Sequence, residues 1–273
     1  MHDDVIEHFL GEGLIDAVIR PLKHGKEASV HLCRANPRLT GERLAALKIY
    51  HPLDRRDFRD ESIYRDGEWI KERRIRVALE KKTRFGREVQ GAIWVHREWE
   101  TLHDLQGSGM HVPRPIESTG EAILMSYVGD EANAAPRLHE HRVSDREEAE
   151  DLADQVIGAI ERMLYRNVIH GDLSAYNLLV WEGEITVIDF PQAVDPRKNR
   201  HAPALLERDL RRVGGHFDRL GVSRPWERLS ADLWTAWEFA DLVPEELRGL
   251  PVTPATGGVG PAGVGPAGVG PGE

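Results

Sequence analysis

A long amphipathic segment followed by two short strands constrains the fold of this chain most. Apolar residues recur at three-and-four spacing from 149 to 164, which predicts a helix with one buried face. The preceding Ser144-Asp145-Arg146-Glu147 matches a capping box, in which the first and fourth residues bind each other's backbone amides. Apolar runs at 178–181 and 185–188 flank the turn 182–184 and predict a hairpin.

The first half of the chain predicts a small sheet with one long helix against it. Residues 28–35 alternate small or apolar with polar side chains, as a half-buried strand does. The runs 44–50 and 122–128 are typical of buried strands. Residues 91–105 have helical periodicity and end at the breaker Gly107-Ser108-Gly109.

The second half is predicted to be mainly helical, with further helices at 204–220 and 226–242. From residue 251 onward Gly, Val, Pro and Ala repeat without a stable apolar face, which predicts disorder. We place the junction between the halves near 127–136. The predicted organisation is a lead-in at 1–20, an N-lobe at 21–128, a C-lobe at 129–250 and a disordered tail at 251–273.

Composition excludes several classes of protein. No apolar run approaches the roughly 20 residues that cross a bilayer, and the acidic N-terminus lacks the features of a secretory signal. Cys33 is the only cysteine, so an intramolecular disulfide and a cysteine zinc cage are excluded. We therefore expect a cytoplasmic protein without a membrane partner.

The charge pattern leaves two interpretations open. A net charge of -10 disfavours generic binding of nucleic acid. Residues 65–87 nevertheless hold nine Lys or Arg against four Asp or Glu. Such a run is more often a solvated helical face, and the alternative is a docking surface for RNA or a ribosomal particle.

The strongest chemical signal is the motif from His170 to Asn177, followed by a second Asp after the predicted hairpin. Phosphoryl transfer needs in-line positioning and neutralisation of phosphate charge, mostly by Mg2+, which prefers oxygen ligands. Asp172 can place a carboxylate at the acceptor, while Asn177 and Asp189 can supply oxygens to the metal. Each residue alone fits a turn or a strand end. All three in this order predict a site for ATP and Mg2+, with Mn2+ as an alternative metal.

A turn of small residues at 25–30, followed by Lys48 in the next strand, predicts a phosphate site. Small residues let backbone amides approach phosphates, and a lysine on the neighbouring strand reaches the same oxygens. Lys48 is flanked by apolar residues, and a charge in such a strand is costly unless it is paired. We expect Glu98 on the long helix as its partner, with Glu100 as the second choice.

Together these motifs resemble the RIO kinases, an atypical protein-kinase-like family, and most closely their type-one branch. The matching segments are the phosphate turn at 25–30, the regulatory-helix segment at 94–102, the Ala-Pro-Arg-Leu tract at 135–138, and the catalytic and metal loops at 172–177 and 188–189. The resemblance implies an α+β, bilobal protein-kinase-like fold with a small β-rich N-lobe and a mainly helical C-lobe.

The resemblance also implies a role for each motif residue. Asp172 would be the catalytic base, and Lys48, held by Glu98, would bind phosphate. Asn177 and Asp189 would bind Mg2+. Asp189 would also be a candidate acceptor that forms an aspartyl-phosphate.

The implied nucleotide site runs from the phosphate turn to the hinge. Adenine would lie behind Met125, against backbone groups of Ser126 and Val128. The implied ATP-binding residues are Lys26, Glu27, Ala28, Ser29, Val30, Lys48, Glu98, Met125, Ser126 and Val128.

Some features depart from ordinary kinases. Asp189 is followed by Phe-Pro-Gln rather than by a glycine ending, and no Ala-Pro-Glu segment follows. We therefore expect the peptide-substrate platform of conventional kinases to be absent. His170 is expected to brace the catalytic loop rather than to bind a metal, and Arg208-Asp209 is expected to form a structural ion pair.

Three functional hypotheses follow. The first is a RIO-type Ser/Thr protein kinase or ATPase that acts on itself or on a protein partner. The second is a small-molecule kinase similar to the aminoglycoside and choline phosphotransferases, which share His-Gly-Asp with a downstream Asn and Asp. The phosphate turn and the 135–138 tract favour the first. The third is a nucleotide-dependent switch that docks on a ribonucleoprotein through 65–87.

Overall fold

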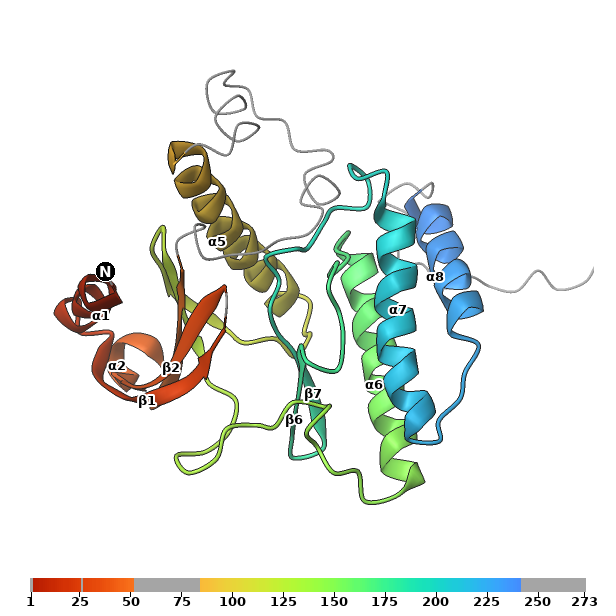
Figure 1. The fold of residues 1–273 in the computed structure, drawn as a ribbon, viewed down its shortest axis with the longest axis horizontal. Helices are drawn as coiled ribbons and strands as arrows, with labels where there is room; N and C mark the ends of the chain where they lie inside the picture. Colours follow the sequence, from red (N-terminus) through yellow and green to blue (C-terminus); the bar gives the residue numbers. More distant parts are fainter. Residues whose placement is uncertain (1, 26, 52–83, 242–273) are drawn as a thin grey trace, which may run out of the picture.

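A computed structural model describes residues 2–25, 27–51 and 84–241 of the chain. Lys26, the tail at 251–273 and residues 65–83 of the basic stretch lie outside the described residues. The described part forms a sheet lobe and a helical lobe (Figure 1), which confirms the α+β, two-lobe prediction. None of its helices is long and apolar enough to span a bilayer.

The N-lobe is a five-stranded antiparallel sheet in the order β1-β2-β3-β5-β4. Its elements are α1 (His2–Gly11), β1 (Ile15–His24), β2 (Ala28–Ala35), α2 (Pro37–Thr40), β3 (Leu44–Tyr50), α5 (Arg84–Gln106), β4 (Pro115–Ser118) and β5 (Ala122–Ser126). The strands predicted at 28–35 and 44–50 are confirmed, and the strand predicted at 122–128 ends at Ser126. Helix α5 contains the predicted helix and begins before it. Helix α1 and much of β1 lie within 1–20, for which the sequence predicts only a lead-in.

The two faces of the sheet are covered by different helices (Figure 1). Alternate residues of a strand point to opposite faces. Leu47 of β3 packs in one apolar cluster with Phe9 of α1, whereas Ala46 packs in another with Val95 of α5. Lys48 lies two residues after Ala46 in β3, so its side chain points to the same face of the sheet. The period of the strand therefore directs Lys48 toward α5.

The C-lobe contains a helical group and the predicted hairpin. Its elements are α6 (Arg146–Tyr165), β6 (Leu178–Trp181), β7 (Glu184–Val187), α7 (Ala202–Arg219) and α8 (Trp226–Asp241). The helices and the hairpin share one apolar core. The 135–138 tract pairs with the hairpin, since the Val180 amide donates to the Pro136 carbonyl at 2.9 Å and the Leu138 amide to the Leu178 carbonyl at 2.8 Å. The chain after the hinge is thus attached to the strand that follows the catalytic motif.

Helix α6 is capped one residue later than the capping-box pattern predicts. The N-cap is Asp145, whose carboxylate accepts from the Glu148 amide at 2.9 Å. The carboxylate that reaches back is Glu148 rather than Glu147, and it accepts from the Ser144 amide at 2.6 Å. Glu148 also pairs with His141 at 2.8 Å. Asp and Ser are comparable N-caps, so the cap residues alone do not decide where the helix begins. The contact of Glu148 with His141 in the preceding loop favours a start at Asp145 over a start at Ser144.

Candidate active site

A cluster of three charged side chains, of which Lys48 and Glu98 are buried and Asp189 is 28% exposed, joins the two lobes. Lys48 of β3 donates to both carboxylate oxygens of Glu98 on α5, at 2.9 and 2.7 Å. It also donates to Oδ1 of Asp189, after the hairpin, at 2.7 Å. The side chains of Lys48 and Glu98 are 11% and 2% exposed. The predicted partner of the lysine is therefore in place, whereas Glu100 lies on the exposed side of α5.

The charges of this cluster do not cancel. Burial alone lowers the pKa of Lys48, but the charges of Asp189 and Glu98 outweigh burial and raise it. Burial raises the pKa of Glu98. Burial also acts to raise the pKa of Asp189, but the Lys48 ammonium more than offsets this and lowers it to about 2. With both carboxylates ionised, the three side chains carry one negative charge in excess. Lys23, whose charge also lowers the pKa of Asp189, or a divalent cation would balance it.

The backbone around Asp189 directs its carboxylate into the cluster. Asp189 has a φ of 76°, in the left-handed region that non-glycine residues seldom adopt. The residues on either side are held, because the Ile188 amide donates to the Asn177 carbonyl at 3.0 Å and the Phe190 amide to Glu98 Oε1 at 3.2 Å. Such strain persists only where the surroundings enforce it, as these two hydrogen bonds do.

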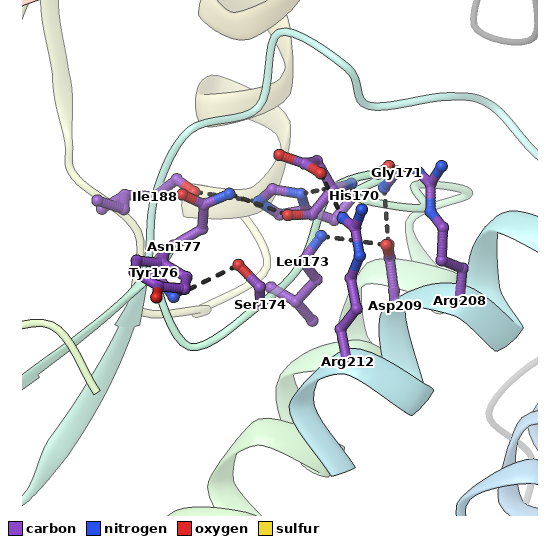
Figure 2. Close-up of polar contacts among 11 residues, drawn as sticks. His170, Gly171, Leu173, Ser174, Tyr176, Asn177, Ile188, Arg208, Asp209 and Arg212 are labelled. Atoms are coloured by element: carbon purple, nitrogen blue, oxygen red, sulfur yellow. Dashed lines mark hydrogen bonds and ion pairs between the residues drawn. The ribbon is translucent and has the colours of Figure 1, made fainter. Parts of the chain in front are cut away.

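The catalytic loop is braced by the neutral His170 ring (Figure 2). Its Nδ1 lies 3.2 Å from the Asp172 amide, which donates to it, so Nε2 carries the proton and donates to the Ile188 carbonyl at 3.0 Å. Burial lowers the pKa of His170 and favours this neutral form. The side-chain amide of Asn177 donates through Nδ2 to the Asp172 carbonyl at 2.9 Å. Its Oδ1 therefore remains the atom suited to a metal.

Helix α7 holds the same loop from its other side (Figure 2). The two carboxylate oxygens of Asp209 accept from the amides of Gly171 at 2.8 Å and Leu173 at 3.1 Å. Arg208 donates to the Gly171 carbonyl. Burial raises the pKa of Asp209 to about 7, despite these hydrogen bonds. The structural ion pair expected of Arg208 and Asp209 stays a prediction, and both residues also contact the catalytic loop.

Two further cations beside the motif residues were missed from the sequence. Arg212, less than one turn after Asp209, forms an ion pair with Asp172 at 2.5 Å. Lys23 of β1 pairs across the sheet with Val30, which in turn pairs with Lys48. Directly opposite residues of antiparallel strands share a face. Lys23 therefore faces the same side as Lys48, and nothing in its local sequence signals this.

The phosphate turn lies between β1 and β2. It is closed by the Gly25 amide, which donates to the Ala28 carbonyl at 2.9 Å. The Glu27 carbonyl accepts from the His51 amide at 2.8 Å, and the Ser29 side chain is buried in β2. The turn is thus tied to the end of the strand that carries the cluster lysine.

An apolar surface continues from this turn to the hinge on the side that faces α5. Its side chains are Leu22, Ala28, Val30, Ala46, Ile123 and Met125. At the hinge, the Ser126 amide donates to the Arg114 carbonyl at 2.8 Å, and the Val128 carbonyl accepts from the Ala135 amide at 3.0 Å. Because these bonds engage the Ser126 amide and the Val128 carbonyl, we expect adenine to meet the Ser126 carbonyl and the Val128 amide instead.

Comparison with known proteins places these residues in a recognised family. A family model described as "RIO domain" matches residues 34–229, which include the charged cluster, the catalytic loop and α7. The phosphate turn lies just before the matched range. A Rio1 kinase of Haloferax volcanii is 33% identical over 219 residues, which cover 80% of this chain and 69% of that protein.

Relatives of both branches are similar to the chain. A Rio2 kinase of Methanocaldococcus jannaschii is 30% identical over 83% of this chain and 77% of that protein. A RIO1 kinase of Chaetomium thermophilum is 29% identical over 80% of this chain, which spans only 42% of that relative. A solved structure of a Rio2 kinase–ADP/Mg2+–phosphoaspartate complex from Chaetomium thermophilum superposes with a TM-score of 0.61 at 19% sequence identity. The match covers 87% of this chain and 70% of the Rio2 chain. This likeness supports the bilobal fold, while the type-one branch stays a prediction.

Proposed function

Because this chain belongs to the RIO domain family, we propose that it is an ATP- and Mg2+-dependent phosphotransferase that acts as a Ser/Thr protein kinase, an ATPase or both. The observation that carries the proposal is the contact of Lys48 with Glu98 and Asp189, which unites a strand, a helix and a loop far apart in the sequence. A buried ammonium between two carboxylates is costly to assemble for stability alone. Such a lysine–glutamate pair and a metal-binding aspartate are both required for phosphoryl transfer in kinases.

The residues of the cluster and the loop divide the transfer between them. Lys48 would bind phosphate oxygens, and its hydrogen bonds to both carboxylate oxygens of Glu98 would hold the ammonium group in place. Asn177 Oδ1 and the Asp189 carboxylate would hold Mg2+, a hard cation that they suit as oxygen ligands. The bound metal would neutralise the phosphate oxygens. Asp172 would take the proton of the acceptor hydroxyl. The hydroxyl oxygen would then bond to the γ-phosphorus as the bond between that phosphorus and ADP breaks.

The nucleotide would lie along the apolar surface of the sheet. Adenine would meet the Ser126 carbonyl and the Val128 amide behind Met125, and the phosphates would meet the turn at 26–30. Lys23 would add a second positive charge on the phosphate side, since it shares a face of the sheet with the cluster lysine.

Asp189 would also serve as a phosphate acceptor. One of its oxygens is held by Lys48 at 2.7 Å, which leaves the other to attack the γ-phosphorus with release of ADP. Water would then hydrolyse the acyl phosphate and restore the carboxylate. This cycle would make the protein an ATPase, and the Chaetomium thermophilum Rio2 structure is itself described as a phosphoaspartate complex.

The finer assignments are also proposals. We place the start of the N-lobe at α1 rather than at residue 21, because α1 and β1 belong to its sheet and core. We keep its end at 128 and the C-lobe at 129–250, and we expect a cytoplasmic protein whose protein substrate includes itself. The relatives reported above are named protein kinases, which favours this function over a small-molecule kinase. Docking on RNA or a ribosomal particle rests on 65–87, of which 65–83 lie outside the described residues.

Incorporation of γ-labelled phosphate from Mg2+-ATP tests the proposal in the wild type, Asp172→Ala and Asp189→Asn. The matched control is Asp232→Asn, an exposed carboxylate on α8 that pairs with Arg228. Base- and hydroxylamine-labile label lost in Asp189→Asn supports the aspartyl-phosphate cycle. Stable label lost in Asp172→Ala supports Ser/Thr autophosphorylation. Wild-type protein that binds nucleotide but neither takes up label nor hydrolyses ATP contradicts the proposal.

A further inference from the structure

Helix α7 contacts the catalytic loop through Asp209, which lies beside Gly171 and Leu173 (Figure 2). Asp209 accepts from the amides of Gly171 and Leu173, the residues that flank Asp172. These hydrogen bonds fix the backbone, but they leave rotation about the side-chain bonds of Asp172 unrestrained. A carboxylate that receives a proton in the transition state must be held in orientation as well as in place.

The contact that holds the carboxylate comes from the same helix. Arg212 Nη1 lies 2.5 Å from Asp172 Oδ1. Arg212 and Asp209 are three positions apart, so they project from neighbouring parts of one helix face. The Arg212 and Asp172 side chains are 44% and 39% exposed. An ion pair this open to solvent adds little to stability, so its removal should test the orientation of Asp172 with little effect on folding.

The loop itself supplies no such cation. Protein-kinase catalytic loops carry His-Arg-Asp, whereas this chain has Gly171 before Asp172. Gly171 has a φ of 79°, which an arginine side chain there would adopt only with strain. A guanidinium can reach Asp172 from α7 instead, as Arg212 does.

We propose that Arg212 is a positioning residue for phosphoryl transfer. By binding Oδ1 of Asp172 it orients the carboxylate, and Oδ2 is left to receive the proton of the acceptor. The proposal rests on the function proposed above, because it concerns the Asp172-dependent step. The alternative is an inhibitory contact, in which Arg212 would block Asp172 until an acceptor displaced the arginine.

The test compares Arg212→Ala and Arg212→Lys with the matched control Arg211→Ala. Arg211 is the adjacent residue, is exposed and pairs with Glu207 along the outer side of α7. The rate is that part of label incorporation or ATP hydrolysis that Asp172→Ala abolishes. It is measured at saturating ATP and as a function of ATP concentration, together with ADP affinity and thermal unfolding.

We expect Arg212→Ala to lower the maximal rate about 10- to 100-fold, as for a misplaced catalytic group. The ATP concentration for half-maximal rate and the affinity for ADP should stay within about 2-fold of wild type, because Asp172 does not bind the nucleotide. Arg212→Lys should recover part of the rate, since it keeps the charge but loses the planar fork of donors. Arg211→Ala should leave all four quantities unchanged.

Four results would overturn the proposal. A maximal rate in Arg212→Ala equal to that of Arg211→Ala would show that the contact with Asp172 does not affect the rate. A faster rate would show that the contact is inhibitory. A loss accompanied by an equal loss of ADP affinity or thermal stability would show a structural role. If the wild type has no Asp172-dependent rate but still hydrolyses ATP through Asp189, this inference fails and the proposed ATPase stands. If it neither takes up label nor hydrolyses ATP, both fail.

Discussion

The Asp209 carboxylate is expected to make the protein less stable as the pH rises from about 5 to about 8. Asp209 is 2% exposed, and burial raises its pKa from the ordinary value of 3.8 to about 7. Between these values the folded chain binds a proton that the unfolded chain has released. Stability is therefore greatest below the unfolded pKa and falls as the pH rises through the folded one.

The size of the effect follows from the two pKa values. Each pKa step is equivalent to about 1.4 kcal/mol, so ionising Asp209 in the folded state costs about 4 kcal/mol over the whole window. About 3 kcal/mol of this falls between pH 5 and pH 8, where denaturation can be measured without acid unfolding. The two amide hydrogen bonds from the catalytic loop already reduce the cost, which would otherwise be larger.

The assay is urea denaturation of the wild type and of Asp209→Asn at a series of pH values. The substitution removes the titrating carboxyl group and keeps the shape of the side chain. The single oxygen of the Asn side chain can replace only one of the two carboxylate oxygens that accept hydrogen bonds from the loop amides. The constant difference between the proteins reports that lost hydrogen bond. The difference that changes with pH reports the carboxylate alone, because every other titrating group is shared. A difference that stays flat from about pH 5 to about pH 8 would refute the reasoning.

Three other substitutions test separate features. Gly214→Ala should destabilise the protein by about 1–3 kcal/mol in denaturant melts, because the added Cβ would lie 2.6 Å from ring atoms of Trp226. Gly215→Ala is its control and should stabilise by about 1 kcal/mol, since beyond the local helix backbone its Cβ would meet only Arg219 Nη1, at 4.0 Å. Equal effects would contradict the packing argument. Lys23→Met should weaken Mg2+-ADP binding by about 3- to 10-fold in calorimetry, as the loss of one partly screened charge beside the phosphates, and an unchanged affinity would remove Lys23 from the site. Glu98→Gln leaves the buried ammonium with one carboxylate fewer and should lower the rate by more than about 100-fold while the protein still folds; a near-normal rate would show that the cluster is structural.

The catalytic loop shows how far local pattern reaches. The order of Asp172, Asn177 and Asp189 around a hairpin could be read from the chain, because each residue type suits one chemical task and the spacing is local. The partner of Lys48 was also predictable, since a charge inside an apolar strand needs an opposite charge nearby. The sequence could not show the positive φ of Asp189, because the hydrogen bonds that impose it come from Asn177 and Glu98.

Sequence by itself determined the strands of β2 and β3, the amphipathic α6, the hairpin and the identity of the chemical groups, because these depend on periods and spacings within one segment. Tertiary structure decided which side chains reach the catalytic loop. The spacing of Asp209 and Arg212 on α7 marks only a shared helix face, and many loops could meet it. Packing of α7 beneath Gly171 and Asp172 selected this loop, because a buried carboxylate and two loop amides satisfy each other only in that arrangement.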